Sequence, residues 1–96
     1  MMRNQIFTIY DVKAKAYITP FVLPNDGMAI RTFQTCANDL NHAFGQHPED
    51  YVLYRIGEFD SDTGELINDK SPELIIKAIE TLKPRETTLD IFEKQS

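Results

Sequence analysis

The sequence has no tryptophan and one cysteine among its 96 residues, and its four glycines are scattered. A single cysteine excludes an internal disulfide, which favours a reducing compartment. The glycine spacing matches neither a dinucleotide-binding loop nor a P-loop. No apolar run approaches the roughly 18 residues that a membrane-spanning helix needs, and the N-terminus lacks the apolar segment of a signal peptide. We therefore expect a cytoplasmic protein that does not enter a membrane.

Ninety-six residues are enough for one hydrophobic core and too few for two. The chain is 42% apolar and 26% charged, as is usual for a globular protein. A domain this short buries only about 60–70% of the surface of its unfolded chain, which favours added stability from a homo-oligomer. The formal net charge of −5 argues against a uniformly basic protein that coats nucleic acid. Residues 1–35 nonetheless hold four basic side chains against two acidic ones: Arg3, Lys13, Lys15 and Arg31 against Asp11 and Asp26.

The first half of the chain shows a strand signal followed by a helix signal. Gln5–Val12 is rich in β-branched and aromatic residues and is predicted as a strand. Two prolines hold the next segment extended, so residues 13–24 are predicted as a connecting arm. A helix is predicted to begin at Asn25 or Asp26, because either side chain can cap the first turn. The apolar stripe of this helix consists of Ala29, Ile30, Phe33, Cys36, Ala37 and Leu40.

The second half of the chain predicts a hairpin. Pro48–Asp50 suits one helical turn, and Tyr51–Asp60 then has the clearest strand alternation in the sequence. A turn over Asp60–Gly64, with its glycine in the left-handed conformation, leads into an antiparallel partner strand. Pro72–Leu82 fits either a helix or a strand, and its first half favours a strand.

These signals predict an α+β fold, a small antiparallel sheet of three to four strands with one main helix packed on one face. Residues 1–82 are expected to form a single domain. Residues 83–96 are mostly polar apart from Leu89, Ile91 and Phe92, and are expected to form a C-terminal tail that serves as a docking segment.

No residue pattern in the chain predicts catalysis, a metal site or a cofactor. The Asp60-x-Asp62-x-Gly64 spacing resembles the start of a calcium-binding loop, but glycine stands at the fifth position where a ligand is required. His42 and His47 lie in a loop with no fixed spacing for a metal, and Cys36 lies on the helix stripe. We interpret these residues as ordinary turn, loop and core positions, and expect the protein not to be an enzyme.

One strand carries the sequence's best candidate for a binding surface. If Val52, Tyr54 and Ile56 meet the helix, then the other face presents Tyr51, Leu53, Arg55 and Phe59. Aromatic and arginine side chains on a sheet can stack unpaired bases, at about 1–3 kcal/mol per base. Strand spacing alone favours a different interpretation, in which this face is a subunit interface. The predicted nucleic-acid-binding residues are Lys13, Lys15, Tyr17, Tyr51, Arg55 and Phe59.

Several short motifs resemble those of a known phage family. They are Tyr10-Asp11-x-Lys13-Ala14, Arg31-x-Phe33, Ala37-Asn38, Pro48-Glu49-Asp50-Tyr51 and Ile56-Gly57-Glu58-Phe59-Asp60-x-x-Thr63-Gly64. Together they resemble the small non-structural protein of gokushoviruses, a branch of the microviruses that infect bacteria. The resemblance runs from about residue 5 to about residue 77. It implies a DNA-binding protein of the host bacterial cytoplasm that acts in single-stranded genome synthesis or its coupling to packaging, and it assigns no binding residue.

Two functions from different classes follow from these observations. The first is a viral single-stranded DNA-binding protein, which the positive N-terminal third, the strand face and the resemblance favour. The second is a protein-interaction factor that regulates viral replication or a host protein without touching DNA, which the net acidity and the apolar tail residues favour. The expected partners are single-stranded DNA, viral replication or assembly proteins, and further copies of the chain.

Overall fold

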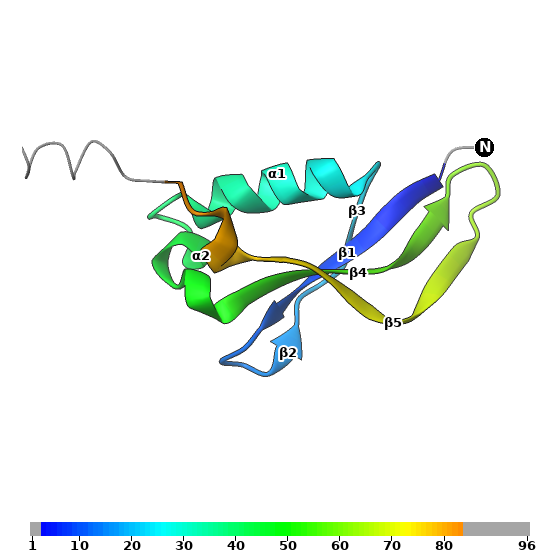
Figure 1. Ribbon diagram of the computed structural model, residues 1–96. Helices are drawn as coiled ribbons and strands as arrows, with labels where there is room; N and C mark the ends of the chain where they lie inside the picture. The colour runs from blue at the N-terminus through cyan, green and yellow to red at the C-terminus, as the bar shows by residue number, and fades with distance from the viewer. Residues whose placement is uncertain (1–2, 84–96) are drawn as a thin grey trace, which may run out of the picture.

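The computed structural model describes residues 3–83 as an α+β fold (Figure 1). One antiparallel sheet has the strand order β2-β1-β4-β5, and β3 pairs with β1 as well. The predicted class and the antiparallel sheet are confirmed, but the sheet has five strands instead of three to four. The elements are β1 (Arg3–Asp11), β2 (Ala16–Tyr17), β3 (Phe21–Leu23), α1 (Asp26–Ala37), α2 (Ala43–Gln46), the 3-10 turn η1 (Pro48–Asp50), β4 (Tyr51–Asp60), β5 (Leu66–Lys77) and the 3-10 turn η2 (Ala78–Thr81).

The two additional strands come from the segment predicted as a connecting arm. The chain turns back after β1, so that Tyr17 of β2 pairs with Tyr10 and Phe21 of β3 pairs with Phe7. Between them, the Thr8 hydroxyl donates a hydrogen bond of 2.7 Å to the Ile18 carbonyl. The prolines keep this segment extended, as expected, but an extended backbone beside a free sheet edge pairs with that edge because its polar groups need partners.

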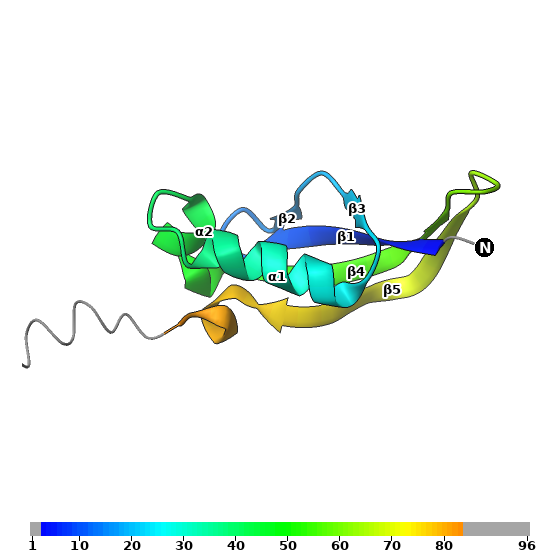
Figure 2. The ribbon, with the colours of Figure 1, turned by 90° about the horizontal axis from the view of Figure 1, so that it is seen from above.

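Helix α1 starts where the sequence predicts. Asn25 is its N-cap, and the Asn25 Oδ1 atom accepts a 2.9 Å hydrogen bond from the Met28 amide. The helix lies along one side of the sheet, as the two perpendicular views show (Figures 1 and 2). Leu40 lies beyond the end of the helix and is 58% exposed, so its predicted place on the apolar stripe is wrong. One buried cluster joins Ala29, Phe33 and Ala37 of the helix to Phe7, Ile9, Leu53 and Ala78.

The face of β4 that meets the helix is the opposite of the predicted one. Leu53 is fully buried in the cluster with the helix residues, and Tyr51 packs against that cluster. Because successive side chains of a strand alternate, Val52 and Tyr54 lie on the other side of the sheet. We call the side towards α1 the helix face and the other side the open face. Tyr51 and Leu53 are as apolar as Val52 and Tyr54. Alternation therefore separates the two pairs of side chains without showing which pair faces the helix.

A register shift divides β4 into two halves. Phe7 of β1 pairs with Arg55, whereas the preceding residue, Ile6, pairs with Gly57, so Ile56 is an inserted residue. Such a bulge reverses the phase of the side chains beyond it. Arg55 therefore lies on the helix face, and Phe59 lies on the open face. The predicted grouping of these two residues on one face is wrong.

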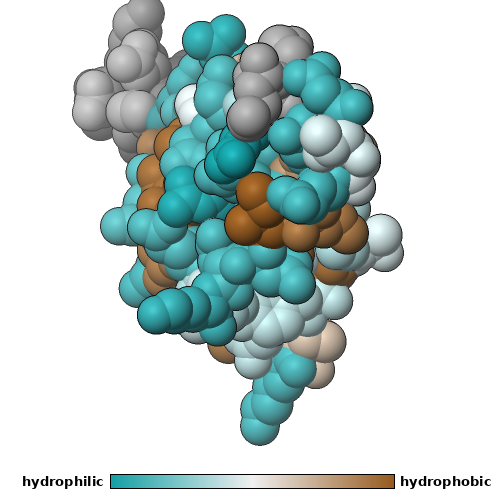
Figure 3. Space-filling model, turned by 90° about the vertical axis from the view of Figure 1, so that its right-hand side faces the viewer, coloured by the Kyte–Doolittle hydropathy of each residue, from teal (hydrophilic) through white to brown (hydrophobic). Residues whose placement is uncertain are grey.

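The predicted hairpin between β4 and β5 is confirmed. Gly64 in the turn has a positive φ of 78°, the left-handed conformation that favours glycine. The ambiguous segment 72–82 continues as strand to Lys77 and then forms η2, so the preference for a strand in its first half is correct. Viewed from the end that carries this hairpin, the surface is mostly hydrophilic, with separate hydrophobic patches (Figure 3).

The predicted tail 83–96, including its apolar residues at 89, 91 and 92, lies outside the described residues except for Lys83. Within residues 3–83, no helix has the length and apolarity needed to cross a membrane.

Candidate nucleic-acid interface

The six predicted binding residues lie at three separate places, two groups and Phe59 alone at the far end of β4. Tyr51 and Arg55 lie on the helix face of β4, next to α1 and the segment that follows it. Lys13, Lys15 and Tyr17 lie at the β1–β2 turn. The predicted platform of Tyr51, Arg55 and Phe59 does not exist as one surface.

Arg55 is bound within the protein. Its guanidinium contacts the carboxylates of Asp26 at 3.3 Å, Asp69 at 3.5 Å, and Glu73, and only 28% of its side chain is exposed. Asp26 begins α1, while Asp69 and Glu73 belong to β5. The arginine therefore ties the start of the helix to two strands, and a group with three carboxylate partners is a poor contact for phosphate.

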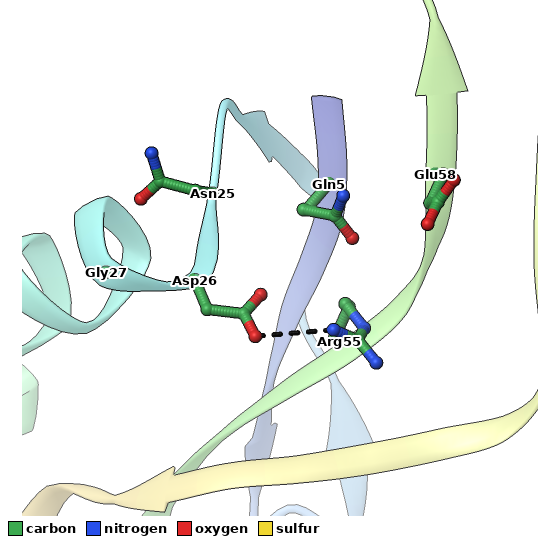
Figure 4. A pocket seen from close by; sticks show the side chains of 6 residues that line it. All are labelled: Gln5, Asn25, Asp26, Gly27, Arg55 and Glu58. Carbon is green, nitrogen blue, oxygen red and sulfur yellow. Dashed lines mark hydrogen bonds and ion pairs between the residues drawn. The ribbon is translucent and has the colours of Figure 1, made fainter. Parts of the chain in front are cut away.

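This arginine lines an open pocket of about 440 Å³ (Figure 4). The Arg55 side chain points towards Asp26 across it. The lining residues are Gln5, Asn25, Asp26, Gly27, Arg55 and Glu58. Two carboxylates accompany the single guanidinium in this lining, so the pocket does not favour an anion.

Tyr51 is partly buried and packs against the core cluster. Its ring lies 4.5 Å from the ring of Phe44, centre to centre, beneath the helical segments. Burial raises the pKa of the Tyr51 hydroxyl, and the nearby carboxylates of Asp11 and Asp50 raise it further. The ring of Tyr51 therefore serves the packing of the fold and is only partly accessible to a base.

Phe59 is half-buried on the open face, far along β4 from the β1–β2 turn. It pairs with Asn4 on one side and with Leu66 on the other. Leu66 is 63% exposed, so this end of the open face is apolar and uncovered by any element of residues 3–83.

Tyr17 belongs to an aromatic group that the sequence did not reveal. Its ring centre lies 4.7 Å from that of Tyr10 and 5.7 Å from that of Tyr54, and the last two rings are 6.4 Å apart. We call these three residues the tyrosine cluster. The three rings come from β2, β1 and β4, and 48% of Tyr17 is exposed. The Tyr10–Tyr17 pair is tilted and the other two pairs are edge-on, and edge-on contact at these distances is favourable, so the rings hold one another in place.

The lysines lie in the turn that leads into the tyrosine cluster. Asp11 fixes this turn, because its Oδ1 atom accepts hydrogen bonds from the amides of Lys13 at 3.0 Å and Ala14 at 3.1 Å. Lys15 has a φ of 56° and is the one non-glycine residue of segment 3–83 in the left-handed region. Both lysines are exposed, and neither forms an ion pair within that segment.

Sequence reasoning missed Tyr10 and Tyr54 as candidate residues. Tyr10 belongs to the same short motif as Lys13, so the sequence showed that the two residues are close along the chain. It did not show that Tyr10 contacts Tyr17. Tyr54 was assigned to the buried side of β4. Their meeting depends on the pairing of Tyr10 with Tyr17 and of Thr8 with Tyr54, which only the strand register gives.

The residues considered for metal binding have structural contacts. The Asp60 carboxylate accepts hydrogen bonds from the amides of Asp62 at 2.9 Å and Thr63 at 3.3 Å, which makes an ordinary Asx turn. His42 caps α2, since its Nδ1 atom accepts a 3.0 Å hydrogen bond from the Phe44 amide. Cys36 and His42 line an apolar pocket of about 270 Å³. The exposed His47 lies in a different group, with Glu49 and Asp50.

The comparisons with known proteins give one family. Residues 4–81 match the family model described as Phage ORF5 protein. The search of curated proteins gave no match, and neither did the search of solved structures. Because the matched segment covers most of the chain and nearly all of the described fold, this phage protein belongs to the Phage ORF5 protein family.

Proposed function

We propose that this phage protein binds single-stranded DNA through the tyrosine cluster and the adjoining lysine turn. The role we infer is that of a gokushovirus non-structural protein in the bacterial cytoplasm, acting in genome synthesis or its coupling to packaging. The observation that carries the proposal is that Lys13 and Lys15 lie in the turn that leads directly into β2, where the ring of Tyr17 is exposed on the open face.

Base stacking is the contribution expected from the tyrosines. Tyr17 offers an exposed ring, and Tyr10 and Tyr54 support it from two sides. One base stacked on an aromatic side chain contributes about 1–3 kcal/mol, whatever the base, because every base has a π-face. A platform of this kind selects unpaired bases, since the bases of a duplex are already stacked on each other.

Phosphate contact is the contribution expected from the turn. Lys13 and Lys15 are free of internal ion pairs in the described part of the chain, so their charges are available to a strand that crosses the tyrosine cluster. Lys15 occupies a backbone conformation that glycine or asparagine would adopt more easily. Strained residues cluster at functional sites, and a lysine at such a position supports a role for its side chain.

Fluorescence anisotropy with a labelled single-stranded oligonucleotide tests the proposal. Tyr17→Ala should weaken binding by about 5–150-fold, the equivalent of one stacked base, while Tyr17→Phe keeps the ring and should retain binding. Lys15→Glu should also weaken binding. Lys70→Glu, which makes the same charge change on β5, is the matched control and should have much less effect.

Salt dependence gives a second measurement in the same assay. The logarithm of the affinity should fall with the logarithm of the salt concentration, with a slope near −0.7 for each phosphate neutralised. Absence of binding at micromolar protein in low salt would refute the proposed function. Binding that is equally strong in the Tyr17→Ala and Lys15→Glu variants would refute the assigned site.

The open face also supports a second candidate function, an interface with another protein. Val22, Leu66 and Leu74 lie on this face and are 47%, 63% and 46% exposed. An uncovered apolar face is typical of an interface with a partner or a second copy of the chain. Sedimentation of the protein alone distinguishes the two functions. A stable dimer that dissociates when Leu74→Asp is introduced, together with no DNA binding, would favour the interface.

A further inference from the structure

A second candidate site lies on the other side of the molecule, beside the C-terminal half of α1. A pocket of about 270 Å³ separates the helix from the segment that follows η2. Among residues 3–83, no carboxylate lines this pocket, in contrast to the pocket around Arg55. Its lining consists of Arg31, Gln34, Thr35, Asn38 and Lys83.

Side-chain amides fix the wall of this pocket. The Thr81 carbonyl accepts hydrogen bonds from Gln34 Nε2 at 3.2 Å and Asn38 Nδ2 at 3.1 Å, and the Lys83 amide donates one of 2.8 Å to Asn38 Oδ1. These bonds hold the backbone of Lys83 against the helix that carries Arg31. Two basic residues from distant parts of the chain are thus brought to one pocket.

The charges of Arg31 and Lys83 are not neutralised within the described residues. Both side chains are exposed, and neither forms an ion pair with any residue of the range 3–83. Two positive side chains around one pocket repel each other, and an anion bound between them reduces that repulsion. A planar guanidinium and an ammonium group are the side chains most often used to bind phosphate.

We propose that the Arg31/Lys83 pocket binds a backbone phosphate of the single strand that crosses the tyrosine cluster. This inference rests on the proposed function and extends it to a second contact point. The sheet supplies a route between the two sites. Tyr17, Tyr10, Val52 and Lys77 form one row across four neighbouring strands, from β2 to β5.

The end of this row leads to the pocket. Strands are spaced by about 4.8 Å, so Lys77 lies roughly 14 Å from Tyr17 along the row. After Lys77 the chain forms the single turn η2 and reaches Lys83, and in doing so it passes from the outer strand to the helix side of the sheet. A strand of DNA that follows the row and rounds the β5 edge meets Lys77, Lys83 and Arg31 in succession.

The carboxylate of Glu80 lies close to the end of this route. Glu80 in η2 is exposed, and its Oε1 atom accepts a 3.0 Å hydrogen bond from the Lys77 amide. A negative charge there opposes a passing phosphate. Glu80→Gln keeps an acceptor for the amide while removing the charge, so it should increase affinity for a strand on this route and leave binding elsewhere unchanged.

The test compares oligothymidines of two lengths in an anisotropy assay. A strand of about 4 nucleotides should reach only the tyrosine cluster, and one of about 16 should also reach the pocket, both within the range of known single-strand sites. Arg31→Glu and Lys83→Glu should weaken binding of the long strand several-fold and flatten its salt slope by about 0.7 for the lost phosphate. Neither variant should affect the short strand, and Lys70→Glu is the control for net charge.

The outcomes separate this inference from the proposed function. Unchanged affinity of the long strand in the Arg31→Glu and Lys83→Glu variants overturns the pocket while leaving the tyrosine cluster intact. Equal losses for both lengths also overturn it, because the effect is then one of general charge. If the protein binds no DNA, amide NMR shifts on adding inorganic phosphate decide the matter. Shifts confined to Thr35, Asn38 and Lys83 support an anion site, and their absence overturns it.

Discussion

Replacing Lys15 by glycine should make the protein more stable and a weaker DNA binder at the same time. The left-handed conformation of Lys15, with φ at 56°, costs a non-glycine residue about 1–2 kcal/mol. Glycine avoids that cost, but it also raises the conformational entropy of the unfolded chain, which lowers the stability by roughly 0.5–1 kcal/mol. The net stabilisation should be about 0.5–1 kcal/mol, which corresponds to an increase in Tm of about 2–8 °C for a domain of this length.

Three variants measured together separate backbone strain from charge. Lys15→Ala removes the ammonium group and keeps the strain, so its Tm should stay near that of the wild type. Ala14→Gly, at the neighbouring position without a positive φ, should lower Tm. Both Lys15 variants should weaken single-stranded DNA binding to a similar extent and flatten the salt slope by about 0.7 if the lysine contacts one phosphate.

Thermal unfolding and anisotropy in the same buffer provide the two measurements. A Lys15→Gly variant that is no more stable than Lys15→Ala would refute the strain argument. If both variants bind DNA as tightly as the wild type, Lys15 contacts no phosphate and is a structural residue of the turn only.

Three further changes test the fold. Gly57→Ala should lower the free energy of unfolding by about 1–3 kcal/mol in a denaturant titration, because its new Cβ would collide with the Ile67 carbonyl. Arg55→Gln should lower the free energy of unfolding by about 1–2 kcal/mol, and by less at high salt, because the carboxylates of Asp26, Asp69 and Glu73 lose their cation. The affinity for DNA should not change. Tyr51→Phe should make the fold less sensitive to alkaline pH. The raised pKa of the tyrosine contributes stability that is present below about pH 10 and is lost as the pH rises further, so the variant should lose less Tm between about pH 9 and 11.

Each of these has a control and a contrary outcome. Gly64→Ala meets no atom within 4 Å, so it should cost only the strain of its positive φ, and an equal loss at both glycines would contradict the collision. A loss of stability in Arg55→Gln that high salt does not reduce would show that packing, and not charge, is its cause. Tyr54→Phe is the control for alkali, and identical pH profiles for the two phenylalanine variants would count against the environment described for Tyr51.

Local signals in the sequence were enough to predict most elements. Asn25 is both a capping residue and the residue before a helical stripe, and Gly64 follows a run of turn-forming residues, so each feature is encoded within a few positions. The strands of the arm were not predicted because β2 and β3 have only two and three residues, and short strands depend on the edge they join. Their presence is a consequence of β1 having a free side.

The candidate site was harder to predict because it depends on register. The inserted Ile56 separates Arg55 from Phe59, and no local pattern marks it. Arg55 looked like a surface cation because its partner Asp26 is 29 positions away in the sequence. The tyrosine cluster escaped prediction for the same reason, since Tyr10, Tyr17 and Tyr54 become neighbours only when three strands are aligned. Lys13, Lys15 and Tyr17 were found because they are close in sequence.

The two amide bonds to the Thr81 carbonyl have a consequence for how the protein is made. Ala78, which is fully buried with the helix residues, and Thr81 are among the last described residues to leave the ribosome. Helix α1 is synthesised about 40 positions earlier, and its C-terminal turn has to wait for these partners. During that interval Phe33 and Ala37 lack part of their final cover, so the nascent chain exposes an apolar surface until Ala78 and Thr81 have left the ribosome.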